Sequence, residues 1–295
     1  MDINPNFFKA ETRSGHFVDE KMKKVWAIEL ELLEQFDSVC KKRNLRYFAD
    51  YGTLLGAVRH NGFIPWDDDI DVVMFRDDYT KLKSIAEKEF VTPIFFQDTY
   101  SDPLIVWVLS KLRNGNTSAI EFPNLPANIF NQGIFIDIFP LDDTFDGIGM
   151  SKFATDFQSQ IWRTISHPQQ SAEYYNSDSC MDPNRSFFKE LLDSHQIERF
   201  KLFEDLCLEQ CEKSTLVNVI TYHFCGNYPP VKRAWFSETV YLPFENFMIP
   251  CPKEFAKVLT VRFNDWQQPV KGLSAHEGIF FEPDIPYSKL LPLKI

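Results

Sequence analysis

No stretch of the sequence approaches the roughly 18 consecutive apolar residues of a membrane-spanning helix. The first residues, MDINPNFFKAETR, also lack the basic segment followed by an apolar segment that marks a secretion signal. We therefore expect a protein without a transmembrane segment that resides in the cytoplasm.

Positive charge is also in short supply. The chain has 31 Lys and Arg against 42 Asp and Glu, which gives a net charge of -11 and a pI of about 5.1. Proteins that bind nucleic acid or anionic membranes through bulk electrostatics need a basic surface. We expect no nucleic-acid partner, and any phosphate group must be held by a few local residues.

Cysteine is sparse, with six residues in a chain of 295, so a dense disulfide framework is excluded and reduced thiols are expected. Cys207, Cys211, His223 and Cys225 are residue types that bind zinc, but their spacing matches no common zinc motif. Cys207 and Cys211 are simply one helical turn apart. A zinc site and a set of buried apolar thiols are the two interpretations of this group.

The composition is that of a globular protein, with 44% hydrophobic residues, 25% charged residues and 29 Phe. Apolar residues at steps of three and four predict an amphipathic helix over residues 17–43. A short strand is expected over 45–52, closing on Gly52, and a helix over 53–60. The pattern then predicts a strand over 70–75 and a helix over 76–90.

Further strands are predicted over residues 93–97, 104–114 and 133–141. Near residue 145 these strand-like runs give way to helical and irregular sequence. We expect a core over residues 1–145, which includes the N-terminal helix. Residues 146–295 are expected to form a helical and irregular C-terminal lobe packed on that core.

Negative charge is concentrated in FIPWDDDIDVVMF, residues 63–75, where four of five consecutive positions are aspartate. Like charges at this spacing repel, and an unpaired buried carboxylate is costly. Strand alternation places Asp69 and Asp71 on the same face at the start of an apolar strand. This arrangement indicates that a cation binds there.

Three other interpretations compete with a catalytic metal site. A solvated acidic turn explains the charge but not the pair that runs into apolar sequence. An EF-hand calcium loop would need glycine where Val72 stands. A metal-dependent glycosyltransferase with an Asp-x-Asp motif is the chemically nearest alternative, although its apolar strand precedes the aspartates, the reverse of the order here.

Mg²⁺, or Mn²⁺ in its place, requires oxygen ligands from a few carboxylates together with substrate phosphate. Asp137 is an isolated carboxylate inside the apolar run GIFIDIFPL, residues 133–141, and is expected on a neighbouring strand. We predict a metal site made by Asp69, Asp71 and Asp137. Asp67 shares their alternation and is predicted to assist, whereas Asp68 is expected to face solvent.

Gly52 and Thr53 open a helix shortly before the aspartates. Glycine allows close approach of the backbone and a helix N-terminus presents free amides, so this turn is predicted to hold phosphate. An ordinary turn with a capping threonine is the alternative. Arg59 on the same helix, and Lys111 and Arg113 on one face of a later strand, are candidate cations for a diphosphate, unless they are ordinary surface charges.

These motifs resemble those of the LicD family, which includes bacterial phosphocholine transferases and belongs to the polymerase-β-like nucleotidyltransferase superfamily. The resemblance is carried by YFADYGTLLGAVRHNGFIPWDDDIDVVMFRDDY (47–79), SKLRNGNT (110–117), GIFIDIFPLD (133–142), FENFMIPCPKEFAKVL (244–259) and FNDW (263–266). The last block departs from the family, which usually has a Tyr-Gly-Asp-Tyr turn. Residues 145–235 match no family motif, and acceptor choice is expected to reside there.

The resemblance implies an α+β fold, with a nucleotidyltransferase-like mixed sheet, flanking helices and a more helical C-terminal lobe. It implies transfer of a phospho-alcohol, most simply phosphocholine from CDP-choline, to a sugar hydroxyl of a cell-surface glycan such as lipopolysaccharide, capsule or teichoic acid. CMP would leave by in-line displacement at phosphorus.

In this comparison Asp69 and Asp71 are metal ligands, and Asp137 is a third ligand or the base. His276 would contact donor or acceptor, and Trp66 either packs over the site or anchors its loop. The alternatives are a metal-dependent enzyme that uses another nucleotide donor and a non-catalytic nucleotide-binding relative.

Overall fold

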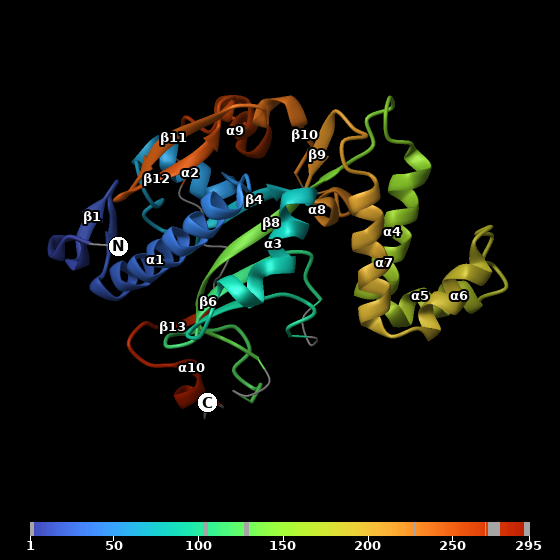
Figure 1. Cartoon of the computed structure of the whole chain (residues 1–295), viewed down its shortest axis with the longest axis horizontal. Coiled ribbons are helices and arrows are strands. Elements are labelled where there is room, and N and C mark those ends of the chain that lie inside the picture. Colours follow the sequence, from blue (N-terminus) through green and yellow to red (C-terminus); the bar gives the residue numbers. More distant parts are fainter. Residues whose placement is uncertain are drawn as a thin grey trace.

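Figure 1 shows a computed structural model of the chain, which describes residues 3–102, 106–126, 130–226, 228–268, 270 and 278–291. The N-terminal half contains η1 (Pro5–Phe8), β1 (Glu11–Arg13), β2 (His16–Val18), α1 (Glu20–Arg43), β3 (Phe48–Ala49), α2 (Tyr51–His60), β4 (Asp71–Phe75), α3 (Arg76–Glu89), β5 (Ile94–Gln97), β6 (Ser110–Asn114), β7 (Ser118–Ile120) and β8 (Ile134–Asp143).

The second half begins with α4 (Lys152–Ser166), α5 (Pro168–Asn176), α6 (Arg185–Asp193), α7 (Gln196–Glu209), β9 (Leu216–Asn218) and α8 (Ile220–Phe224). It continues with β10 (Val231–Lys232), η2 (Arg233–Phe236), β11 (Thr239–Phe244), β12 (Phe247–Pro252), α9 (Phe255–Phe263), β13 (Phe280–Glu282) and α10 (Tyr287–Leu290). Helices and strands are thus mixed throughout, which confirms the predicted α+β class.

The predicted N-terminal helix corresponds to α1. The Asp19 side chain caps its start by accepting a hydrogen bond of 2.7 Å from the backbone N–H of Met22. Its last turn carries Lys41, Lys42 and Arg43, which oppose the negative end of the helix dipole, and Asn44 ends it in the left-handed conformation. Its apolar side buries Trp26, whose ring stacks on Phe63 at a centroid distance of 4.6 Å.

The central sheet has seven strands and is mixed, as predicted. Its order is β10, β9, β8, β4 and β3, and β6 pairs with both β8 and β5. The neighbours β4 and β8 run parallel, whereas β6 is antiparallel to β8. Helices α1 and α3 pack against strands of this sheet. This is the mixed sheet with flanking helices that the family resemblance implied.

One predicted strand is shorter than expected. The apolar pattern indicated a strand over 104–114, but β6 begins at Ser110, where pairing with β8 starts. The described residues just before it, 106–109, are irregular and include Trp107 and Leu109, which line the cavity described below. Apolar side chains here serve the cavity wall instead of a strand face.

The second half of the chain has two parts. Helices α4 to α7 form a group beside the sheet (Figure 1), which the helical texture after residue 145 predicted. The chain then returns to the core: β9 pairs with the end of β8, the β11–β12 hairpin packs on α2 and β3, and α9 packs on α2. The division of the chain at residue 145 stays a prediction, and residues 216–263 are structurally continuous with the core.

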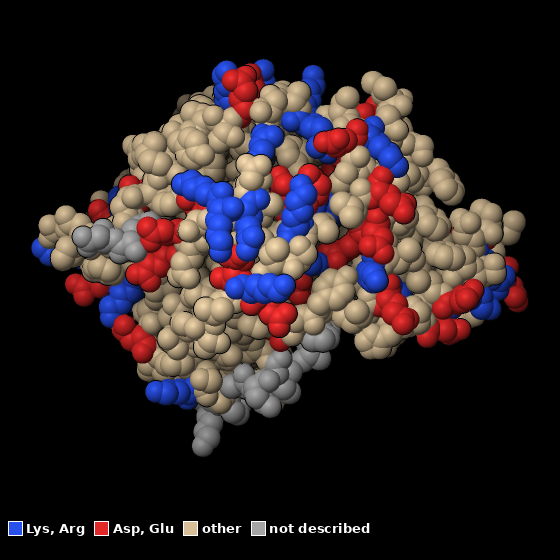
Figure 2. All heavy atoms as spheres, viewed as in Figure 1, with Lys and Arg blue, Asp and Glu red and all other residues tan. Residues whose placement is uncertain are grey.

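Charges of both signs share the face seen in Figure 2, where a central group of Lys and Arg has Asp and Glu side chains among it. Lys42 and Arg43 pair with Glu89, and Lys81 Nζ lies 3.2 Å from Asp78 Oδ1.

Within the described ranges, none of the helices is both long and apolar enough to cross a bilayer.

Candidate functional site

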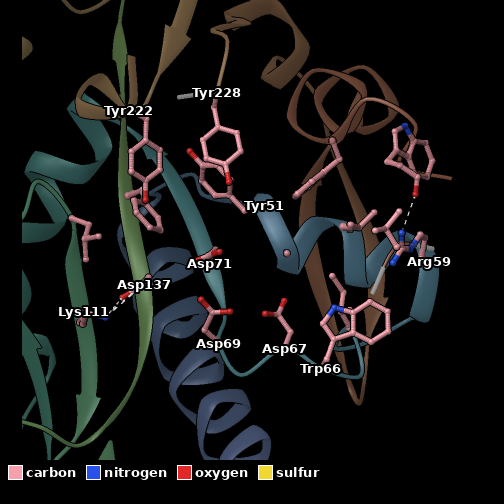
Figure 3. A pocket seen from close by; sticks show the side chains of 18 of the residues that line it. Tyr51, Arg59, Trp66, Asp67, Asp69, Asp71, Lys111, Asp137, Tyr222 and Tyr228 are labelled. Carbon is pink, nitrogen blue, oxygen red and sulfur yellow. Dashed lines mark hydrogen bonds and ion pairs between the residues drawn. The ribbon is translucent and has the colours of Figure 1, made fainter. Parts of the chain in front are cut away.

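A cavity of about 610 Å³ opens where β4 begins, beside β8. Figure 3 shows its acidic centre, with Asp67, Asp69, Asp71 and Asp137 between tyrosines on one side and Trp66 and Arg59 on the other. The lining comprises Tyr51, Gly52, Leu55, Arg59, Ile64, Trp66, Asp67, Asp69, Asp71, Trp107, Leu109, Lys111, Glu121, Asp137, Phe139, Tyr222, Tyr228, Phe263, Asp265, Trp266, Gln268 and Val270.

Strand pairing brings the predicted metal ligands together. Asp71 of β4 stands directly opposite Asp137 of the parallel strand β8. The Asp137 N–H donates a hydrogen bond of 2.8 Å to the carbonyl of Ile70 just before β4. Carboxylate oxygens of Asp69, Asp71 and Asp137 lie within 4.8 Å of one another. The isolated Asp137 therefore lies beside the Asp-x-Asp pair, as the sequence predicted.

The electrostatics of this cluster favour a bound cation. Burial, followed by the charges of Asp69 and Asp137, raises the pKa of Asp71 well above its usual value. Glu29 of α1 is also buried, with no hydrogen bond to Oε2, and burial followed by the charge of Asp69 raises its pKa strongly. Like-charge repulsion of this kind is relieved by a positive charge among the carboxylates.

The donor set fits a hard divalent ion. All its atoms are carboxylate oxygens, which Mg²⁺ and Mn²⁺ accept. Asp67, Asp68 and Asp69 form a second group whose oxygens meet the same 4.8 Å limit. Among the described residues, the side chains that come together as metal ligands are these two acidic groups, which share Asp69.

The expectation that Asp68 faces solvent is wrong. Its exposed fraction is 8%, equal to that of Asp69, although the alternation of an extended strand would place the two on opposite sides. Residues 67–70 precede β4 and are not part of a strand, so the strict alternation does not apply to them. Helix α1 covers this loop, and Trp26 Nε1 donates a hydrogen bond of 3.0 Å to the carbonyl of Asp67.

Gly52 and Thr53 both lie at the start of α2, but they differ in what they contact. Gly52 lines the cavity, as expected for a backbone that approaches a ligand. Thr53 is buried, and its hydroxyl accepts a hydrogen bond of 2.7 Å from the Asp71 N–H. The side chain of Thr53 therefore fixes the first residue of β4, a role that the predicted phosphate turn did not include.

Replacement of Gly52 by alanine is expected to displace the Asp67 carboxylate. A Cβ at this position would lie 2.4 Å from Asp67 Oδ2, which is closer than such atoms can approach. The clashing atom is the end of a flexible side chain that can move aside, so the expected cost is at the low end for overpacking, about 1 kcal/mol. Thermal unfolding of Gly52→Ala should show this loss, and the loss should largely disappear when Gly52→Ala is made in an Asp67→Ala background. An equal loss in both backgrounds would contradict this explanation.

Arg59 is positioned as the prediction for a phosphate ligand requires. Its side chain lines the cavity from α2 and is half-buried, and NH1 donates a hydrogen bond of 3.1 Å to the carbonyl of Trp266. Its Nε is buried with no hydrogen-bond partner among the described residues. Burial lowers the pKa of Arg59, which still leaves the group cationic at neutral pH.

Lys111 and Arg113 lie on one face of β6, but only Lys111 lines the cavity. Lys111 Nζ is 3.1 Å from Asp137 Oδ1 and 3.5 Å from Glu121 Oε1. Arg113 is fully buried, with hydrogen bonds to Gln97, Glu121 and, at 2.9 Å, the carbonyl of Gly133. The prediction that Arg113 binds phosphate is therefore corrected. Its N–H donors are used in hydrogen bonds within the protein, so its role is structural.

The remaining predictions have separate outcomes. Trp66 lines the cavity and contacts His16, so the two roles weighed for it are combined. His276 lies outside the described residues. Cys207 is buried in α7, where its Sγ accepts a hydrogen bond of 3.7 Å from Gln158, whereas Cys225 is exposed. Within the described ranges, the residues weighed as zinc ligands, Cys207, Cys211, His223 and Cys225, do not form a ligand group.

Sequence reasoning missed the ion pair that attaches α9 to the site. Arg262 NH2 donates a hydrogen bond of 2.9 Å to Asp50 Oδ2, and both side chains are fully buried. Asp50 also accepts from the Tyr51 N–H at 2.8 Å, so it caps α2 immediately before Gly52. No local pattern links two residues so far apart in the chain.

The tyrosines of the cavity were missed as well. Tyr51 has a φ of 46°, a left-handed conformation that is strained for a residue other than glycine and that recurs at functional sites. Tyr222 and Tyr228 come from the stretch that matched no motif. Only the position of Tyr51 next to Gly52 gave any signal that one of these rings would line the site.

Comparisons with known proteins agree with this geometry. Residues 44–178 match the family described as LicD/FKTN/FKRP, nucleotidyltransferase domain. A stretch of 71 residues, 24% of this chain, is 42% identical to a lipopolysaccharide cholinephosphotransferase LicD of Haemophilus influenzae. Stretches of 55 residues, 19% of this chain, are 42% and 40% identical to uncharacterized proteins of Rickettsia prowazekii and Rickettsia typhi.

These matched stretches cover 23%, 21% and 18% of the three relatives, so each likeness concerns less than a quarter of the relative's length. The family match is longer and spans the aspartate loop, β4, β6 and β8. Residues 44–178 therefore match the nucleotidyltransferase domain of the LicD/FKTN/FKRP family, which is what this part of the chain is similar to.

Proposed function

We propose that this protein transfers a phospho-alcohol group, phosphocholine in the first instance, from a CDP-alcohol to a sugar hydroxyl of a cell-surface glycan. The observation that carries the proposal is the triad Asp69, Asp71 and Asp137 at the centre of a cavity of about 610 Å³. The name of the Haemophilus relative supports phosphocholine as the group and lipopolysaccharide as one class of acceptor.

The triad is the proposed site of Mg²⁺ or Mn²⁺. When bound, the ion supplies Lewis-acid stabilisation of the charge on the phosphoryl oxygens. The protein's own contribution is to hold the reactants in line. Gly52 allows the backbone of α2 close to the donor, and Arg59 offers its unpartnered Nε to the diphosphate.

The proposed transfer exchanges one phosphorus–oxygen bond for another. The sugar hydroxyl oxygen forms a bond to the phosphorus that bears the alcohol, while the bond from that phosphorus to the CMP oxygen breaks and CMP leaves as an anion. The hydroxyl proton must pass to a base. Asp137 is the proposed acceptor of this proton, because its carboxylate lies within the acidic cluster at the centre of the cavity.

Thermal shift assays test the donor class. A ligand that binds only the folded state stabilises it by about 2.7 kcal/mol at 100 times its Kd, which corresponds to a rise in Tm of roughly 5 °C for a chain of this size. With Mg²⁺ present, CDP-choline is expected to give this shift and UDP-sugars none. CDP-ribitol is included for comparison, because it is a CDP-alcohol whose head group is uncharged.

Two outcomes would replace the proposal. A shift with UDP-sugars alone would favour the glycosyltransferase alternative. A shift with CDP-choline, but no CMP release when the protein is offered deacylated lipopolysaccharide, capsule fragments or teichoic acid, would favour a binding protein without turnover. CMP release that depends on one of these glycans is the expected result.

A further inference from the structure

Three tyrosines form one wall of the cavity and have no role in the transfer described above. Tyr51 begins α2, Tyr222 lies in α8, and Tyr228 follows α8. Their ring centroids are 5.3 Å apart for Tyr51 and Tyr228, 5.7 Å for Tyr222 and Tyr228, and 6.0 Å for Tyr51 and Tyr222. Figure 3 shows these rings, here called the tyrosine cluster, grouped beside Asp71 and Asp137.

The surroundings of the tyrosine cluster favour a cation. An aromatic face attracts positive charge through its quadrupole, most strongly where water is excluded. Figure 3 shows Tyr222 near Asp137 and Tyr51 near Asp71, and all four side chains line the same cavity. The rings and the carboxylates therefore act in the same direction.

The cluster already holds one cation from within the protein. The guanidinium carbon of Arg262 lies 4.8 Å from the ring centroid of Tyr51 and 5.9 Å from that of Tyr228. In the described part of the chain, no Lys or Arg lies over the ring of Tyr222. Tyr222 thus offers a ring that lines the cavity and is not engaged by a protein cation.

The opposite side of the cavity favours an anion instead of a cation. Arg59 lies there beside Trp66 (Figure 3), and its unpartnered Nε suits an anion. Lys111 is on the side of Asp137, but it is paired with Asp137 and Glu121. A donor with an anionic diphosphate and a cationic head group would therefore bind with its diphosphate toward Arg59 and its head group toward Tyr222.

We propose that the tyrosine cluster binds the quaternary ammonium group of the donor and selects such donors over those with an uncharged alcohol. This inference rests on the proposed function, which places the phosphorus at the aspartates. In phosphocholine, two methylene groups separate the ammonium nitrogen from the oxygen bound to phosphorus. The ammonium must therefore lie next to the metal site, and Tyr222 lies there. A quaternary ammonium has no N–H to donate, and aromatic faces are its usual protein partners.

The test compares KM values for CDP-choline and CDP-glycerol in Tyr222→Leu and Tyr222→Phe. Loss of the ring is expected to raise KM for CDP-choline about 30-fold, since a desolvated cation–π contact is worth about that factor, and to leave KM for CDP-glycerol within about twofold. Tyr222→Phe keeps the ring and should behave as the unsubstituted protein. Tyr241→Leu, on the exposed strand β11, is a control for loss of a tyrosine elsewhere.

An equal rise in KM for both donors in Tyr222→Leu would overturn the inference and leave the proposed function intact. Absence of turnover with CDP-choline in the unsubstituted protein would overturn the proposed function. In that case, calorimetry with phosphocholine and glycerol phosphate in the presence of Mg²⁺ tests whether the tyrosine cluster binds the ammonium group. Weaker binding of phosphocholine alone in Tyr222→Leu supports the inference, and unchanged binding of both ligands contradicts it.

Discussion

Replacement of Asp71 by asparagine is expected to reduce transfer by at least about 10³-fold and, at the same time, to raise the Tm of the metal-free protein. The first effect follows from loss of metal-held charge stabilisation, which supplies several kcal/mol at about 1.4 kcal/mol per tenfold. The second follows from the removal of one of several carboxylates whose oxygens lie within 4.8 Å of each other. A residue that only supports the fold would not give both.

The effect of pH separates these contributions further. The pKa of Asp71 is raised in the folded chain by burial and by Asp69 and Asp137. The folded state therefore retains a proton that the unfolded state has already released, so the metal-free protein should lose stability as pH rises from the usual aspartate range through this raised pKa. The Asp71→Asn variant should lose less stability over the same rise in pH. Mg²⁺ should stabilise the unsubstituted protein more strongly at higher pH.

Calorimetric unfolding with and without Mg²⁺, together with CMP release, measures both effects. Asp77→Asn is the matched control, because Asp77 is close in sequence, about half-exposed, and pairs with Lys81 at the surface. It should change neither the Mg²⁺ shift nor turnover. Wild-type turnover by Asp71→Asn in the presence of Mg²⁺ would show that the metal assignment is wrong.

Arg262→Met is expected to be the most destabilising single substitution in the second half of the chain. It removes the partner of Asp50 while both positions are fully buried. An uncompensated buried charge costs about 3–5 kcal/mol, which lowers Tm by on the order of 10 °C. Arg262 NH1 also donates a hydrogen bond of 3.1 Å to Asn218, so β9 loses a contact as well.

The double variant Asp50→Asn with Arg262→Met distinguishes a charge effect from a packing effect. Recovery of most of the lost stability indicates that the stranded carboxylate was the cause, whereas additive losses would indicate packing. Arg43→Met is the control, because Arg43 pairs with Glu89 at the surface, where such pairs contribute at most about 1 kcal/mol.

The sequence was sufficient where the chemistry is local. Helix α1, strand β4 and helix α3 follow from apolar periodicity and end signals, and the isolated carboxylate in an apolar run located Asp137 on a strand of the core. The same reasoning could not place Asp68, because it assumed strand geometry for a loop that α1 covers. It misjudged Arg113 for a related reason, since a strand face can point into the protein as well as into a cavity.

Contacts between residues far apart in the chain are the other features that the sequence could not predict. Asp50 and Arg262 are joined across most of the chain, and Tyr222 reaches the cavity because β9 pairs with the end of β8. Neither contact has a sequence motif, since tertiary packing alone creates them. The family resemblance covered the aspartate cluster but was silent on residues 145–235, where two of the three tyrosines lie.

The dispersed lining of the cavity has a consequence for the order of events during synthesis. The aspartate loop leaves the ribosome about 190 residues before Arg262, a delay of about 10 to 40 s at translation rates of 5–20 residues per second. During that interval Asp50 and the start of α2 exist without their cation, and the tyrosine wall is incomplete. A nascent chain can form its first sheet strands early, but the wall of the cavity cannot be complete before α9 has been made.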